Sequence, residues 1–197
     1  ASNNTAVGYE SMKANTTGTR NVSVGKSSLA ANTTGVDNVG VGESALVANT
    51  TAANNTALGS AALQANTTGA SNTGVGRAAL NANTTAANNT AVGYFALVAN
   101  TTGASNTAVG SLAGAALTTG DENTFIGDTA GDATTTATGN TAVGFSSLTT
   151  NVLGSRSVAI GRAALQVQNP ASAVNMYNTA VGFGAGESVT VGTQNTL

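Results

Sequence analysis

The chain of 197 residues contains no histidine, no cysteine and no tryptophan, and it has one proline and only six basic and eight acidic residues. Without cysteine there is no disulfide framework, thiol nucleophile or thiolate metal site; without histidine, imidazole base catalysis and most zinc sites are excluded. A net charge of −2 provides no electrostatic footprint for nucleic acid. No apolar run approaches the ~18 residues of a membrane span, so we expect no membrane insertion.

Small residues dominate what is present. Ala (38), Thr (33), Gly (25), Asn (24) and Ser (16) make up 136 of the 197 residues, while Leu, Ile, Val and Phe together number 37. Such a composition is compatible with a flexible low-complexity tract or with a repeat structure built from small side chains. The order of the residues decides between these two interpretations.

A segment of the type N-T-A-V-G returns with a 17-residue period. Its first residue stands at Asn4, Asn21, Asn38, Asn55, Asn72, Asn89, Asn106, Asn123, Asn140, Ser157, Asn178 and Asn195, so ten of the eleven intervals equal this period. A four-residue insertion within 166–177 lengthens the remaining interval. We therefore predict one repeat domain over 1–197, made of about eleven 17-residue coils. Since the chain ends on the opening of another unit, we expect a segment of a longer fibre.

The unit reads N-T-A-V-G-x-x-A-L-x-A-N-T-T-G-x-x, and its positions are numbered here from the leading Asn. Position two is Thr or Val and position four is always aliphatic, which is typical of one face of a short strand. The invariant Gly at position five indicates a positive φ or a close backbone approach. We expect a second extended stretch around A-L-x-A and a polar turn at N-T-T-G.

These features predict an all-β fold, a parallel β-solenoid in which each repeat unit forms one coil. A helical solenoid is the competing fold, but A-L-x-A is short and lies between Gly and N-T-T turns, whereas helical repeats usually need a unit roughly twice as long. Eleven coils at roughly 4.8 Å each would form a rod about 50 Å long.

Each coil offers only two or three large apolar side chains, which is little against the entropy of ordering a whole repeat unit. We therefore expect several chains to pack side by side and to bury the small residues at positions three, eight and eleven. A homotrimer is the assembly we predict, and a slim monomeric solenoid with Ala and Asn ladders is the alternative.

The segment Ser157-Val158-Ala159-Ile160-Gly161, together with the N-T-A-V-G copies, resembles the S-V-A-I-G repeats in the head domains of trimeric autotransporter adhesins. The longer pattern N-T-A-V-G-Y-x-A-L followed by A-N-T-T-G is similar to repeats in the fibres of tailed phages. The resemblance implies a left-handed parallel β-roll assembled as a trimer, located outside the cell, at a cell surface or on a virion. The 17-residue step of this chain is longer than the usual coil of the adhesin heads.

The function we expect is that of a structural and adhesive fibre segment, a shaft or head that mediates attachment to a glycan or protein receptor. An enzyme is not expected, since a catalytic site needs unique residues and this chain repeats itself. One alternative is an ice-binding solenoid with ladders such as Asn15/Thr17 and Asn32/Thr34, although adjacent Thr16 and Thr17 would point to opposite faces of an extended segment. Another alternative is the subunit of a self-assembling surface filament.

Position six is the most variable of the unit and follows the Gly corner, so we expect it to be exposed. Stacking of the coils places Lys26 beside Glu43, and Arg162 between Phe145 and Phe183, where cation–π contacts can form. Such a row either contacts a receptor or is a solvated edge that keeps the rod soluble and in register. The insertion, which holds the only proline, is expected to loop out from the rod. The candidate receptor-contact residues are Tyr9, Tyr94, Phe95, Phe145, Arg162, Pro170, Tyr177 and Phe183.

Four acidic residues, Asp121, Glu122, Asp128 and Asp132, lie close together in sequence and raise the question of calcium. They lack the Gly-Gly-x-Gly-x-Asp periodicity of calcium-binding rolls. We therefore predict no metal site and no cofactor.

Overall fold

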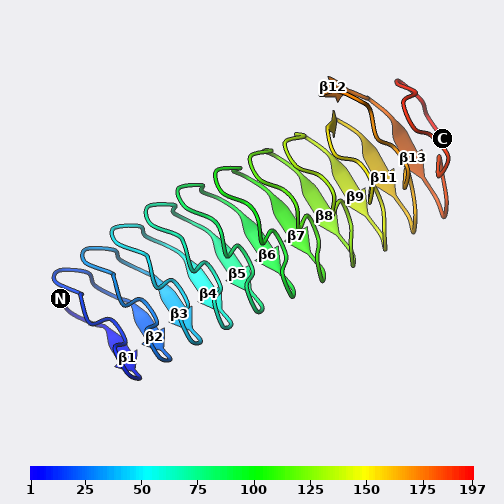
Figure 1. Cartoon of the computed structure of the whole chain (residues 1–197). Helices are drawn as coiled ribbons and strands as arrows, with labels where there is room; N and C mark the ends of the chain where they lie inside the picture. Colours follow the sequence, from blue (N-terminus) through cyan, green and yellow to red (C-terminus); the bar gives the residue numbers. More distant parts are fainter.

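The computed structural model describes all 197 residues, which form a rod of stacked coils (Figure 1). Eleven short strands, one from each coil, make a single parallel sheet in the order β1-β2-β3-β4-β5-β6-β7-β8-β9-β11-β13, and β10 and β12 make a second sheet of two strands. The chain has no helix, and the predicted all-β parallel β-solenoid is confirmed. The strands are β1 (Thr5–Val7), β2 (Val22–Val24), β3 (Val39–Val41), β4 (Thr56–Leu58), β5 (Thr73–Val75), β6 (Thr90–Val92), β7 (Thr107–Val109), β8 (Thr124–Ile126), β9 (Thr141–Val143), β10 (Gly154–Ser155), β11 (Val158–Ile160), β12 (Val174–Asn175) and β13 (Thr179–Val181).

The pairing register follows the sequence repeat. Thr90 of β6 pairs with Thr107 of β7, and the same step of one repeat unit holds from β1 to β11. At the insertion the step grows by the four inserted residues, with Val158 paired to Thr179, so equivalent unit positions still lie on top of one another. Like residues therefore form ladders along the rod.

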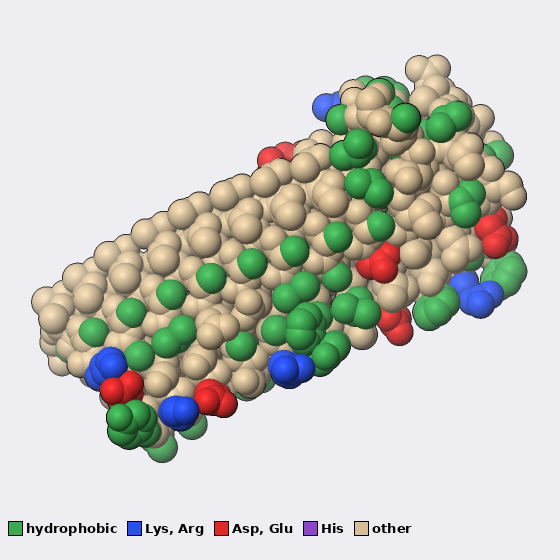
Figure 2. Space-filling model, viewed as in Figure 1, with side chains coloured by type: hydrophobic (Ala, Val, Ile, Leu, Met, Phe, Trp, Pro, Cys, Tyr) green, Lys and Arg blue, Asp and Glu red, His purple; other side chains and the backbone are tan.

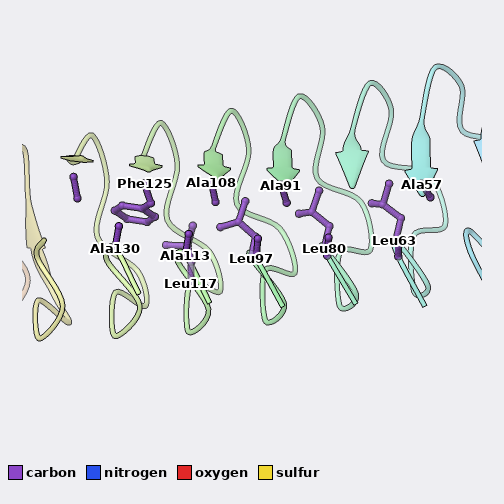
Figure 3. Close-up of a cluster of buried hydrophobic side chains, with 14 of the residues drawn as sticks. Ala57, Leu63, Leu80, Ala91, Leu97, Ala108, Ala113, Leu117, Phe125 and Ala130 are labelled. Atoms are coloured by element: carbon purple, nitrogen blue, oxygen red, sulfur yellow. The ribbon is translucent and has the colours of Figure 1, made fainter. Parts of the chain in front are cut away.

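The core is a continuous stack inside the coils. In strands β2 to β9, β11 and β13 the middle residue, at position three, points inward. It meets the small residue of position eight and the leucine of position nine, as Ala91, Ala96 and Leu97 do, all fully buried. Figure 3 shows Ala91 and Leu97 in this stack. The expectation that positions three and eight are buried between chains is wrong, because each chain buries them within its own coil. Position eleven is half-buried in most coils.

The A-L-x-A segment is not extended, contrary to prediction. It is a succession of turns, and both position nine and the residue just before the segment, position seven, have positive φ, for example 50° at Leu97 and 56° at Phe95. Inter-coil hydrogen bonds hold this backbone in place: the amide of Leu97 donates to the carbonyl of Ala113 at 3.0 Å, and the amide of Ala99 donates to that of Ala115 at 3.3 Å. The strands therefore cover one side of the coil, and turns complete it.

One coil fills its core differently. Phe125 replaces the small residue of position three and is fully buried (Figure 3). Position nine is Gly114 in the preceding coil and Gly131 in the same coil, where a Cβ atom would lie 2.7 Å and 2.5 Å from the Phe125 ring. The aromatic ring thus takes the space that leucine fills in most other coils.

Two ladders of buried asparagine satisfy the backbone inside the rod. At position one, Asn72 accepts a hydrogen bond from the amide of Asn89 (2.9 Å) and donates to the carbonyl of Ala86 (2.8 Å). At position twelve, Asn83 donates to Asn66 (2.8 Å) and to the same carbonyl of Ala86 (3.1 Å). The N-T-T-G segment is therefore held by side chains from its own coil and from its neighbours.

Candidate functional site

The outward side of the eleven-stranded sheet carries two rows of side chains, at unit positions two and four, which we call the outer strand face. Position two is Thr or Val, and position four is aliphatic in every coil. The most exposed members of the second row have 37–60% of their surface accessible. They are Val7, Leu58, Val109, Ile126, Ile160 and Val181. An apolar row thus runs along the whole rod without a partner in the chain.

Sequence reasoning missed this surface because it assigned the interface to the small residues, which lie inside the coil. The signal was present in the sequence. Position two accepts Thr, whereas position four never does. Thr and Val would satisfy a strand equally well at position four, so its constant apolar character needs another explanation.

A second feature is the position-six ridge, which follows the Gly corner along one edge of the rod. It consists of Tyr9, Lys26, Glu43, Ser60, Arg77, Tyr94, Ser111, Asp128, Phe145, Arg162 and Phe183. All of these are exposed except Ser111, which is half-buried. Figure 2 shows that charged side chains and bulky hydrophobic ones gather along one edge of the molecule, below a broad, mostly uncharged surface.

Two clusters of aromatic and guanidinium groups stand on this ridge. In the first, the Arg77 guanidinium lies 5.8 Å from the ring centroid of Tyr94 and 5.4 Å from that of Phe95, and it donates a hydrogen bond to the Tyr94 hydroxyl at 3.3 Å. In the second, Arg162 lies 5.5 Å from the Phe145 centroid and 5.3 Å from that of Phe183. The expected placement of Arg162 between two phenyl rings is confirmed.

Ion pairs occupy the N-terminal part of the rod. Lys26 and Glu43 approach to 3.4 Å on the ridge, as expected, and Lys13 pairs with Glu10 at 2.9 Å. At position seventeen, Arg20 makes a bidentate ion pair with Asp37: its Nε donates to Oδ1 at 2.6 Å and its Nη2 donates to Oδ2 at 2.8 Å. The hydrogen bonds from Arg20 lower the pKa of the Asp37 carboxyl. Both side chains are in water, which screens their attraction.

The other proposed contact residues are scattered. Tyr9 lies on the first coil and is 71% exposed, whereas Phe95 is half-buried beside Tyr94. Pro170 is buried in the single chain, contrary to the exposure that a receptor-contact residue would need. Tyr177 is 48% exposed, and its hydroxyl accepts a hydrogen bond from Asn175 at 3.3 Å.

Contrary to the expectation that it loops out, the insertion folds back onto the rod over part of its length. Its strand β12 pairs with β10 of the preceding coil, while Gln168 and Met176 are fully buried at its two ends. Gln168 takes the place of a ladder asparagine: it donates to Asn151 (3.2 Å) and accepts from Asn178 (2.8 Å). The exposed residues are Asn169, the stretch 171–175 and Tyr177.

The acidic residues of the middle coils do not form a group of three that could hold a metal ion. Asp132 is half-buried, and its Oδ1 atom has no hydrogen-bond partner. Burial raises the pKa of the Asp132 carboxyl, and the negative charge of Asp128 adds to this effect. The chain has no helix of the length and hydrophobicity needed to cross a membrane.

Together these features define a parallel β-solenoid rod with an aliphatic row on its outer strand face and a charged, aromatic ridge. Comparison with protein-family models, with curated proteins and with solved structures gave no match.

Proposed function

We propose that the protein is a segment of an extracellular attachment fibre, in which three chains pack their outer strand faces together and present their ridges outward. The observation that carries this proposal is the unbroken aliphatic row at position four, whose members are exposed or half-buried in the single chain. Burial of this row would be the main gain on assembly.

The outer strand face alone is smaller than a standard protein interface. Eleven coils about 4.8 Å apart and strands three residues wide give a face of ~500 Å². A standard interface buries about 800 Å² on each partner, so the flanking turns would have to contribute as well. Long rods joined along this face would be stiff, because neighbouring coils already share their backbone hydrogen bonds.

The trimer would carry three copies of every ridge. Weak contacts with a surface receptor would then act together, since binding of the second and third copies becomes intramolecular. A cell surface or a virion is the location we propose for such a fibre.

The test is the oligomeric state of two matched variants. Val92→Lys places a charge in the middle of the outer strand face, at a side chain that is half-buried in the single chain. Thr85→Lys places the same charge on an exposed turn of a neighbouring coil. Size-exclusion chromatography with light scattering should show a trimer for the unmodified chain and for Thr85→Lys, and a monomer for Val92→Lys with unchanged circular dichroism. Trimers of equal stability from both variants would contradict the proposed interface.

Ice binding is a second candidate, favoured by a different set of residues from the turn ladders considered above. The Thr and aliphatic side chains of positions two and four form two regular rows on one sheet, one pair per coil. This role needs the outer strand face free in a monomer, so it competes with the trimer. Thermal hysteresis from a monomeric rod, abolished by Val92→Lys, would support ice binding and contradict the fibre.

A further inference from the structure

We propose that the Arg77–Tyr94–Phe95 cluster and the Phe145–Arg162–Phe183 cluster are binding sites for acidic sugars, such as uronic or sialic acid units of a surface polysaccharide. This inference rests on the attachment function proposed above and names the class of receptor. It places the carboxylate of the sugar on the guanidinium group and the ring of the sugar on an aromatic side chain.

The aromatic residues that these clusters carry at position six are not needed by the fold. Position six accepts Ser, Lys, Glu and Asp in other coils, so nothing inside the coil requires a ring there. Phe145 and Phe183 nevertheless leave 49% and 76% of their surface in water, and Tyr94 leaves 50%. Exposed rings offer an electron-rich face on which the C–H groups of a pyranose can pack.

The two arginines lack a carboxylate partner. The three ion pairs of the chain are made by Lys13, Arg20 and Lys26, whereas the guanidinium groups of both clusters lie against aromatic rings. A guanidinium stacked on a ring keeps N–H groups available that match a carboxylate bidentately. Arg77 uses one N–H group for the Tyr94 hydroxyl, and its other N–H groups have no partner. Each cluster therefore combines an unpaired anion-binding group with a surface for an apolar sugar face.

The small size of the clusters favours a sugar over a folded protein. A standard protein interface needs about 20–30 residues on each side, whereas each cluster has three large side chains on a ridge where residues such as Ser60 and Ser111 are small. The clusters lie five coils apart, about 24 Å along the rod at ~4.8 Å per coil. Such a separation suits a polymer that offers the same acidic unit repeatedly.

The experiment measures binding of the full chain to immobilised polygalacturonate and to a sialyllactose-bearing polymer. Methyl-esterified polygalacturonate tests the need for the carboxylate, and poly-L-glutamate presents carboxylates without sugar rings. The variants are Arg77→Gln, Arg162→Gln, their combination, and Phe183→Ala. Arg156→Gln is the matched control, because Arg156 is an exposed arginine that stacks on no aromatic ring and makes no ion pair.

We expect at least one acidic polymer to bind, the esterified polymer and poly-L-glutamate to bind much less, and each cluster arginine substitution to weaken binding about tenfold. The double variant should lose binding, Phe183→Ala should weaken it, and Arg156→Gln should retain it. Absence of binding to both acidic polymers, equal binding of poly-L-glutamate, or an equal loss in Arg156→Gln would overturn the sugar site. A trimer that fails to bind acidic sugars would leave the fibre proposal standing, whereas a monomer that binds them would contradict the fibre and keep the sugar site.

Discussion

At unit positions with positive φ, the space around the backbone determines which residues are accepted. Position five is always Gly, with φ between 126° and 145°, and in Gly59 an added Cβ would lie 2.5 Å from the carbonyl oxygen of Gly76 in the next coil. Position nine has φ near 50° and accepts Leu as well as Gly. Both positions have positive φ, but only position five brings the backbone of the next coil so close that a side chain has no room.

Gly59→Ala should therefore lower the free energy of unfolding by about 3 kcal/mol, from backbone strain and displacement of the neighbouring coil. The control is Gly139→Ala at position seventeen, where φ is 67° but an added Cβ would meet only the Cγ atom of Arg156, at 3.6 Å. Thermal denaturation of the two variants measures the difference. Equal losses would show that close packing at position five is not the reason for its glycine.

Asp132→Asn should stabilise the rod at neutral pH. Burial raises the pKa of the Asp132 carboxyl, so the folded chain holds this proton more tightly than the unfolded chain, and stability falls as the pH rises through the interval between the two pKa values. Asparagine has no charge to desolvate, and Asn81 already occupies the same unit position. Melting temperatures should differ most at pH 7 and converge below the usual Asp range; a constant difference across this range would contradict the assignment.

At the scale of the structural element, the asparagine ladders join one coil to the next. The carbonyl of Ala86 receives hydrogen bonds from both ladders, and the amide of Asn89 depends on Asn72 alone. The ladder at position twelve is interrupted where Leu117 replaces asparagine, and the Oδ1 atom of Asn100 in the preceding coil is left without a partner. A missing ladder residue thus exposes its neighbour's polar group to an apolar interior.

Asn72→Ala should cost about 2–3 kcal/mol, because it leaves the buried amide of Asn89 without an acceptor. Asn81→Ala removes two hydrogen bonds as well, to Gln64 (2.9 Å) and to the carbonyl of Ala61 (3.0 Å), but at a half-buried site that water can reach. Its cost should stay below about 1 kcal/mol. Chemical denaturation measures the free energy of unfolding of both variants. A larger decrease in Asn81→Ala than in Asn72→Ala would refute the importance of the ladder.

Phe125 and the two glycines that surround it fill the core space that alanine and leucine fill in the common coil. Phe125→Ala alone should lose about 3–5 kcal/mol through the cavity it creates. Adding Gly114→Leu and Gly131→Leu restores the alanine and leucine of the common coil and should recover most of the loss, while Gly131→Leu alone should destabilise the chain. Melting curves of the unmodified chain, Phe125→Ala, Gly131→Leu and the triple variant test this coupling. Destabilising effects that simply add in the triple variant would disprove it.

The sequence predicted the strands and the ladders well because both follow from the 17-residue step. Lys26 meets Glu43, and Arg162 meets Phe145 and Phe183, as in-register stacking requires. The turns at A-L-x-A could not be predicted, since Leu and Ala rarely adopt positive φ. The glycines at 114, 131 and 186 were the only sign. The burial of Pro170 depends on how the insertion folds back, which residue types alone do not specify.

At the scale of the whole molecule, the rod separates two kinds of surface. Its interior is closed by alanine, leucine and asparagine from a single chain, so stacking does not require partner chains to cover positions three and eight. The outer strand face leaves its aliphatic row at position four at the surface, and the position-six ridge carries most of the exposed aromatic and charged groups. In the fibre we propose, the first surface joins chains and the second meets the receptor.

The mass of the unmodified chain in solution tests the proposed assembly most directly. Multi-angle light scattering should give three times the 18.9 kDa of one chain, independent of concentration over the range in which the rod is soluble. A stable monodisperse species of 18.9 kDa would contradict the proposal that the outer strand face joins chains into a fibre.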